Sequence, residues 1–202
     1  GQAVTCDDFV AAMADANNRD LSAFQRWYSQ AGTPTVSVKR SVKNKSLMLN
    51  LTQALPETAA KTLRLPQPIP MSLAFFAADG RQLSFSIDGA AAGTEQVYLL
   101  SDAEATITLE ASDGDITKAV PSLLRGFSAP VRLVTDISRA ELCHLIAHDT
   151  DPFNRYEAAQ SLFQHNITAR LNGKADETGE RQLADALISL LQDVSLLDDF
   201  KA

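Results

Sequence analysis

The sequence predicts a mixed, mainly β protein, in which an antiparallel β-sandwich is flanked by α-helical segments at both ends. Three observations predict this fold class. Between about residues 35 and 134, short runs alternate apolar and polar residues, as strands with one buried face do. Turn residues separate these runs at short intervals. Before and after this stretch, apolar residues recur every three or four positions, which is the period of an amphipathic helix.

The composition is that of a folded, water-soluble domain rather than a disordered or membrane-spanning chain. Of 202 residues, 45% are hydrophobic and 21% are charged. No apolar run approaches the roughly 20 residues that cross a bilayer, and no secretion signal is visible at the start. A formal charge of -7 and a pI near 4.9 argue against nucleic acid or an anionic membrane as partner. The two cysteines, Cys6 and Cys143, fall in separate segments, so we expect a reducing, cytoplasmic compartment.

The first helix is expected to begin after Thr5. Thr5 and Asp8 have the spacing of an N-terminal capping box, and Phe9 and Met13 follow at helical spacing. This pattern predicts a short amphipathic helix.

A second short helix is expected from Asp20, whose side chain can cap it. Gly32 is placed to end this helix, and Pro34 prevents it from resuming. Aromatic residues share one face of the predicted helix, where we expect them to pack in the core: Phe24, Trp27 and Tyr28.

The central part of the chain is expected to contain seven short strands in about 100 residues, a density typical of an antiparallel sandwich. The runs that alternate are residues 36–38, 47–51, 69–77, 83–87, 97–100, 106–109 and 131–134. Asp79-Gly80, between two of them, is a strong hairpin signal.

The period returns to that of helices from Ser138. Ser138 and Glu141 form a capping box, and Asp151-Pro152 supplies an N-cap with proline at the first helical position. The helix after Pro152 is expected to bury one face until Asn172-Gly173. That face consists of Phe153, Tyr156, Ala159, Phe163 and Ile167.

A third helix in this part is expected to use the apolar residues Leu183, Leu187, Leu190, Leu191 and Val194. Ser195 has the position of a cap for a fourth. Neither helical end closes a bundle by itself, so we expect the chain to be a middle piece of a larger protein.

Several stretches resemble the M1 family of zinc aminopeptidases, of the bacterial aminopeptidase N type. The stretches VTCDDFVAAMADANN and DLSAFQRWYSQAGTP, from residues 4–18 and 20–34, are similar to the end of the family's catalytic domain. PSLLRGFSAPVRL, from residues 121–133, resembles the last strand region of its Ig-like third domain. DPFNRYEAAQSL, from residues 151–162, resembles the first helices of its C-terminal domain.

The resemblance implies a division of the chain into three parts and a parent enzyme of four domains. Residues 1–32 would be the helical end of a catalytic domain, residues 33–134 an Ig-like β-sandwich, and residues 135–202 the start of an α-helical C-terminal domain. The parent would release N-terminal residues from peptides with zinc held by an H-E-x-x-H helix. Neither that motif nor the family's G-A-M-E-N loop occurs in this sequence. We therefore expect no catalytic residue, no metal ligand and no cofactor in this segment, with zinc in the parent.

The most suggestive local cluster is Cys143-His144 with His148. His144 and His148 lie four residues apart and share a helix face, as zinc ligands in H-E-x-x-H do. However, Leu145 stands where the general-base glutamate is needed, and Ile167 lies nineteen residues after His148, where the family has a glutamate ligand. Asp149 and Asp151 could add oxygen ligands across a helix break. The preferred interpretation is that His148 stabilises the C-terminal end of a helix.

Three other motifs are more simply explained as ordinary turns and loops. Gly126-Phe127-Ser128 resembles part of a nucleophile elbow, but Pro130 stands where G-x-S-x-G needs glycine. Asp113-Gly114-Asp115 lacks the later glutamate of an EF-hand loop and predicts a turn. Gly89 and Gly93 flank three alanines and predict a loop without a phosphate cradle.

The sequence therefore favours a non-catalytic structural segment: a β-sandwich spacer with flanking helices, whose partners are the neighbouring domains of its own parent chain. Peptides would be substrates of the parent. Two alternatives stay open, namely an independent Ig-like protein-binding module and a small metalloenzyme that uses His144 and His148.

Overall fold

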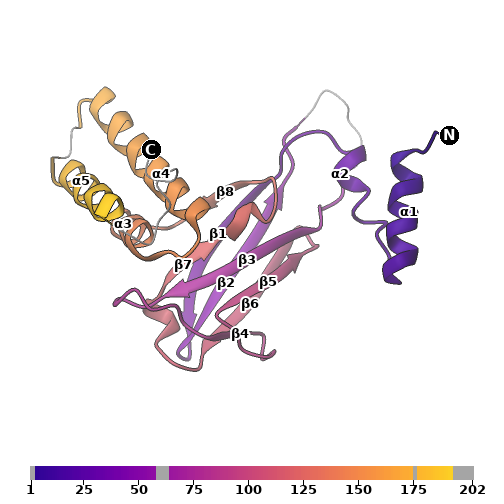
Figure 1. The fold of residues 1–202 in the computed structure, drawn as a ribbon, viewed down its shortest axis with the longest axis horizontal. Helices are drawn as coiled ribbons and strands as arrows, with labels where there is room; N and C mark the ends of the chain where they lie inside the picture. Colours follow the sequence, from indigo (N-terminus) through magenta and orange to yellow (C-terminus); the bar gives the residue numbers. More distant parts are fainter. Residues whose placement is uncertain (1–2, 58–63, 175–176, 193–202) are drawn as a thin grey trace.

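The structure is a computed structural model that describes residues 3–57, 64–174 and 177–192. A two-layer β-sandwich occupies the middle, and the helices lie at opposite ends of it (Figure 1). Helices α1 and α2 are at one end, and α3, α4 and α5 are at the other. The predicted sandwich with flanking helices is confirmed.

One layer is a five-stranded sheet in the order β4-β6-β2-β1-β8. Its strands are β1 (Thr35–Lys43), β2 (Ser46–Ala54), β4 (Phe85–Ile87), β6 (Glu104–Ala111) and β8 (Arg132–Thr135). Neighbours are antiparallel except β1 and β8, which are parallel. That pair departs from the antiparallel pattern because β8 arrives from the other sheet rather than through a hairpin.

The second layer is a three-stranded sheet in the order β5-β3-β7, with β3 (Ile69–Phe76) in the middle. β5 (Glu95–Leu100) and β7 (Val120–Leu123) pair with it on either side. The sequence pattern missed β7. All four of its residues are buried, so no alternation marks it, and Pro121 weakens its strand signal.

The Asp79-Gly80 turn forms, but it closes only one bridge of a hairpin. Ala77 N–H donates to Arg81 O (2.8 Å), and Phe76 pairs with Gln82. The chain then crosses to the other sheet, where β4 pairs with β6 instead of β3. The predicted hairpin is therefore reduced to a turn between the two layers.

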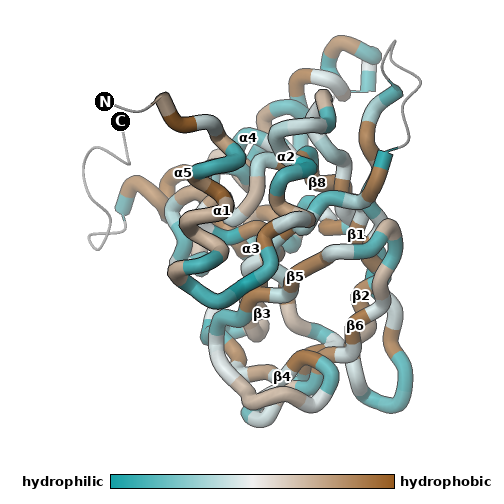
Figure 2. Tube along the Cα trace, turned by 90° about the vertical axis from the view of Figure 1, so that its right-hand side faces the viewer, coloured by the Kyte–Doolittle hydropathy of each residue, from teal (hydrophilic) through white to brown (hydrophobic). Residues whose placement is uncertain are grey.

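The main core lies between the two sheets. Alternate residues of β2, β3 and β6 belong to this core. Figure 2 shows hydrophobic positions, in brown, along these strands. The largest side chains without exposed surface include Phe75 and Phe85, whose rings meet edge to face at 4.9 Å. Because both faces of this core are strands, the sandwich needs no helix to close it.

At the N-terminal end, α1 (Cys6–Asn17) starts at the capping box predicted from Thr5 and Asp8. α2 is shorter than expected and spans only Arg26–Ser29. The predicted start at Asp20 is wrong, because its side chain accepts a hydrogen bond from Ser22 N–H (2.8 Å) and holds a turn instead.

The aromatic face of this segment is only partly buried. Trp27 packs against the sandwich core and its indole N–H donates to Pro68 O (3.1 Å). Phe24 and Tyr28 are exposed and stack edge to face on each other at 5.7 Å. The expectation of core packing is therefore correct for Trp27 and wrong for the other two residues.

At the other end lie α3 (Arg139–His148), α4 (Pro152–Leu171) and α5 (Glu177–Gln192). The capping box of α3 and the N-cap of α4 at Asp151 form as predicted. Val194 and Ser195 lie outside the described residues. Among the residues described, no helix is long and apolar enough to cross a membrane.

The buried face of α4 differs from the predicted one. Tyr156, Phe163 and Ile167 are exposed. The residues that α4 buries are Asn154, Arg155, Ala158, Ala159 and Leu162. The pattern misled because two polar side chains point inward, where they find hydrogen-bond partners.

Candidate functional site

The three-stranded sheet is shared by two hydrophobic clusters. Leu73 and Phe75 of β3 face the sandwich core, whereas Ala74 and Phe76 face the helices. The second cluster also includes Val120, Leu142, Leu145, Ile146, Ala158, Ala159, Leu162, Leu183, Ala186 and Leu190. β3 is thus a common wall, and we call the contact of the sandwich with α3 and α4 the junction.

Arg125 is the centre of the polar part of the junction. It lies in the short 3-10 helix Arg125–Phe127 that follows β7, and only 5% of its side chain is exposed. Its guanidinium donates to Glu95 Oε2 (Nε, 2.9 Å), to Ser122 Oγ (Nη1, 3.1 Å) and to Thr150 Oγ1 (Nη2, 2.8 Å). One side chain therefore connects β5, β7 and the segment between α3 and α4.

Arg125 also pairs with Asp149, whose side chain has no exposed surface. Asp149 Oδ1 accepts a second hydrogen bond from Asp151 N–H (2.8 Å). A charge pair with this degree of burial is costly to desolvate, and it persists because each charge meets the other in fixed geometry. The pair joins the sandwich to the α3–α4 connection.

The start of α4 adds further hydrogen bonds. Asp151 caps α4 by accepting from Phe153 N–H (3.0 Å), and it also accepts from Gly126 N–H of the sandwich. Asn154 Nδ2 donates to Ser122 Oγ (2.7 Å) and to Leu123 O (2.9 Å). The first turn of α4 is therefore held to β7 by hydrogen bonds from both its cap and its inward face.

A second charged link connects β1 with α3. Arg40 donates to Asp136 Oδ1 (Nε, 2.7 Å) and pairs with both carboxylate oxygens of Glu141. Burial alone would raise the pKa of Glu141. The hydrogen bonds from Arg40 and from Ser138, together with the charge of Arg40, outweigh burial and hold that pKa at about 2 instead of 4.5.

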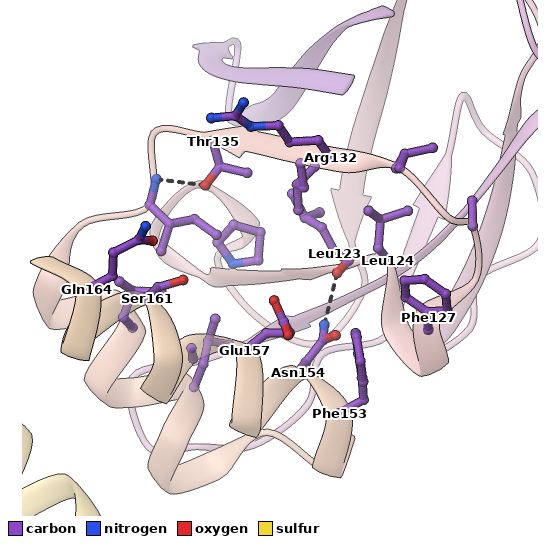
Figure 3. Close-up of a pocket in the computed structure, with 18 residues that line it drawn as sticks. Leu123, Leu124, Phe127, Arg132, Thr135, Phe153, Asn154, Glu157, Ser161 and Gln164 are labelled. Carbon is purple, nitrogen blue, oxygen red and sulfur yellow. Dashed lines mark hydrogen bonds between the residues drawn. The ribbon is translucent and has the colours of Figure 1, made fainter. Parts of the chain in front are cut away.

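A cavity of about 420 Å³ opens between the sandwich and helices α3 and α4 (Figure 3). Its wall is mostly apolar and comes from β7, the loop to β8, β8 itself, α3 and α4. The polar residues Asn154, Glu157, Ser161 and Gln164 line it from α4. Sequence analysis did not predict this cavity.

The structure brings His144 and His148 together on α3, where His148 lies against the Asp79-Gly80 turn. Their ring centroids are 4.6 Å apart, and the ring of His148 covers Gly80, where an added Cβ would lie 2.4 Å from His148 Nδ1. Burial, then the charge of His148, lowers the pKa of His144. Its Nε2 is buried and has no hydrogen-bond partner among the described residues.

The histidine pair has no third potential metal ligand beside it among the described residues. His148 rests on a turn of the sandwich, and the buried Nε2 of His144 is closed off from solvent. In residues 3–57, 64–174 and 177–192, no group of three or more His, Cys, Asp or Glu side chains could hold a metal ion. His148 is the last residue of α3, as the preferred interpretation required.

The other candidate motifs make local contacts. Ser128 Oγ accepts from Ser72 N–H (3.2 Å), beside the loop that carries Arg125. Asp113 accepts from Ser84 N–H (3.0 Å) and pairs with Arg81, and Asp115 caps a short 3-10 helix. Gly89 lies in a tight turn with φ +77°, and Gly93 pairs with Phe85.

The junction residues were missed because nothing in the sequence pairs Arg125 with Asp149 across 24 positions. The one signal available in the sequence was the placement of polar residues among apolar ones. Arg125 interrupts an apolar stretch after Leu124, and Asn154 and Arg155 occupy two adjacent positions at the start of α4. Polar residues placed among apolar ones often find buried partners.

Comparison with known proteins agrees with this architecture. A family model described as a domain of unknown function (DUF3458) with an Ig-like fold matches residues 32–136. A second, DUF3458_C, described as ARM repeats, matches residues 139–202.

Two relatives are bacterial aminopeptidases N. That of Escherichia coli K12 is 36% identical over 96% of this chain, and that of Caulobacter vibrioides is 39% identical over all of it. In each case the match covers 22% of the relative, so the chain spans about a fifth of its length.

A solved structure, aminopeptidase A of Legionella pneumophila in complex with aspartic acid, is similar with a TM-score of 0.75 and 26% identity. It covers 96% of this chain and 21% of the other. The chain therefore belongs to the DUF3458 family with an Ig-like fold, and it is homologous over nearly its whole length to a segment of bacterial aminopeptidases of the N type.

Proposed function

We propose that this chain is a non-catalytic structural segment of a zinc-dependent aminopeptidase that releases N-terminal residues from peptides. Its homology to about a fifth of aminopeptidase N supports a place within a peptidase. Its role would be geometric: the sandwich fixes the position of the helices at one end relative to the segment at the other.

The observation that carries this proposal is the shared wall at the junction. β3 packs into both hydrophobic clusters, so the helices cannot turn on the sandwich without disturbing both cores. The Arg125–Asp149 pair and the Arg40–Glu141 pair tie the same two parts at separate points. Such a connection suits a rigid spacer better than a flexible linker.

We expect metal and substrate binding to belong to other parts of the parent protein, because of the potential metal ligands that this chain contains. No group of three or more potential ligands is found among the described residues, which supports the proposal that zinc and the peptide substrate are held by other parts of the parent. The neighbouring domains would be the partners of this segment. Phe9 and Met13 of α1 are exposed on one helix face and are suited to such contacts. The free thiols Cys6 and Cys143 are consistent with a cytoplasmic, reducing location.

The direct test is an assay of the purified 202-residue chain on alanyl- and leucyl-p-nitroanilide, with and without added zinc. We expect no turnover above the rate of a heat-denatured sample. Zinc titration by calorimetry, with His148→Ala as the matched variant, tests the metalloenzyme alternative. Zinc-dependent turnover, or tight stoichiometric zinc binding lost in His148→Ala, would contradict the proposal.

A second candidate function is an independent protein-binding module. β5 is an edge strand that pairs only with β3 in the described structure, and its Val97 and Leu99 are exposed. A specific partner captured equally well by the whole chain and by residues 33–134 alone would favour this alternative. If capture needs both helical ends, the spacer proposal is supported.

A further inference from the structure

We propose that the cavity at the junction is a binding site for a small amphipathic organic cation, a molecule with an apolar body and a primary ammonium head. The inference does not depend on the proposed function, because it concerns only the shape and charge of this cavity. It rests on the cavity's dimensions, on the exposed carboxylate of Glu157, which pairs with no described residue, and on the positions of the lining groups (Figure 3).

The cavity has the size and position of a small-molecule site. Its volume of about 420 Å³ falls within the range of such sites, which are commonly found where two structural units meet. Here the units are the sandwich and the helices. The apolar side chains that line it include Leu123, Leu124, Ala129, Leu133, Leu142 and Leu145. These groups would bury a hydrocarbon body.

Glu157 selects the charge of the ligand. Its carboxylate points into the cavity from α4, and it makes no hydrogen bond or ion pair with any described residue. Arg132 also lines the cavity, but its guanidinium extends along β8 away from the centre (Figure 3). A cation can therefore pair with Glu157, whereas a carboxylate ligand would meet a like charge.

A neutral polar group, the hydroxyl of Ser161, lines the same end of the cavity as Glu157. Ser161 lies one turn after Glu157 on α4, and its hydroxyl can accept a hydrogen bond from an ammonium group. The amide nitrogen of Asn154 is already committed to Ser122 Oγ and Leu123 O, so it serves the fold. An ammonium with three donors fits Glu157 and Ser161 together.

The opposite end of the cavity is aromatic. Phe127 and Phe153 close it, with ring centroids 5.4 Å apart, and Figure 3 places them away from Ser161 and Gln164. A flat or branched hydrocarbon would contact these rings while its amine reaches Glu157. The site is therefore polarised along its length, as an amphipathic ligand requires.

The test is titration of the ¹³C-methyl-labelled chain with 4-phenylbutylamine, followed by NMR. We expect saturable shifts centred on the methyl groups of Leu123, Leu124, Leu133 and Leu142, with Kd on the order of 1 mM. 4-Phenylbutan-1-ol should bind more weakly, and 4-phenylbutyrate should bind most weakly of the three.

Glu157→Gln is the decisive variant, and Glu104→Gln, an exposed glutamate on β6, is its matched control. Glu157→Gln should weaken the amine by about fivefold, to the level of the alcohol, and should leave the alcohol unchanged. Glu104→Gln should bind all three probes like the original chain. The proposal is overturned if no saturable shift appears, if shifts fall outside the cavity, if amine and acid bind equally, or if Glu157→Gln has no effect.

Discussion

At the scale of single residues, Arg125 and Asp149 illustrate how a charge can be kept inside a small protein. Arg125 distributes its donors over three elements, and the ring of Phe76 lies 5.8 Å from its guanidinium carbon. Asp149 lies in the turn between two helices and is fully buried. Each charge compensates the other, so neither side chain can be removed without leaving an uncompensated buried charge.

Arg125→Ala should therefore lower the free energy of unfolding by about 3 to 5 kcal/mol. Arg81→Ala is the matched control, because its pair with Asp113 is solvent-exposed and should contribute only about 0 to 1 kcal/mol. Urea unfolding followed by circular dichroism measures both. Equal losses in the two variants would show that the buried pair has no special role.

Glu141 makes the stability depend on pH. Its pKa of about 2 in the folded state lies below the value of 4.5 expected in the unfolded chain. The stabilisation is therefore complete above about pH 4.5 and is lost as the pH falls toward 2. Because the side chain is partly exposed, solvent screening limits the effect to about 1 to 2 kcal/mol.

Glu141→Gln tests this dependence while it keeps a residue able to complete the capping box. The variant should be less stable than the original chain at pH 7, and the difference should shrink as the pH approaches 2. Urea midpoints at pH 7, 4.5 and 2.5 provide the measurement. A difference that stays constant, or that grows in acid, would rule out the Arg40 interaction as its source.

At the scale of elements, the sequence predicted what depends on local chemistry. The capping boxes at Thr5 and Ser138 and the N-cap at Asp151 are formed by residues close in the chain, so their patterns identify them directly. Seven of the eight strands were found, and in strands such as β1, β2 and β6 alternation records the single buried face.

The elements that sequence reasoning missed depend on tertiary contacts. β7 is buried on both faces and carries Pro121, so it has neither alternation nor strand propensity. α4 buries Asn154 and Arg155 because Ser122 and Ile146 O lie opposite to receive them. No local pattern contains those partners. The junction and its cavity belong to the same class, because both are assembled from segments far apart in sequence.

The Asp79-Gly80 turn contacts α3 at Gly80. Gly80 has φ +83°, and His148 occupies the space that a side chain would need. Gly80→Ala should cost at least about 2 kcal/mol, from backbone strain and displacement of the ring together. Gly173, with φ +68° and open space around its Cα, is the control and should cost about 1 kcal/mol when changed to Ala.

Thermal or urea unfolding of the two alanine variants gives this comparison. The double variant Gly80→Ala with His148→Ala isolates the contact, because it removes the ring that the new Cβ would strike. Recovery of most of the excess loss is expected. If Gly80→Ala costs no more than Gly173→Ala, the turn does not depend on its packing against α3.

At the scale of the whole molecule, the essential feature is that one sheet serves two cores. Because strands alone close the sandwich, the helices could have been attached to it by a flexible linker without packing against it. Here the outer faces of β3 and β7 pack against α3 and α4. Buried hydrogen bonds hold the same interface together. The sequence predicted both parts and their order, but the extent of their contact required the structure.

The most direct test of this account is the distance distribution across the junction, measured by double electron–electron resonance. Spin labels at exposed positions Lys43 of β1 and Gln160 of α4 would report it, with Cys6→Ser and Cys143→Ala to remove the native thiols. The account predicts one narrow distribution, as wide as the labels' own rotamers allow. A broad or two-peaked distribution would mean that the helices move independently of the sandwich, and would contradict the proposal of a rigid spacer.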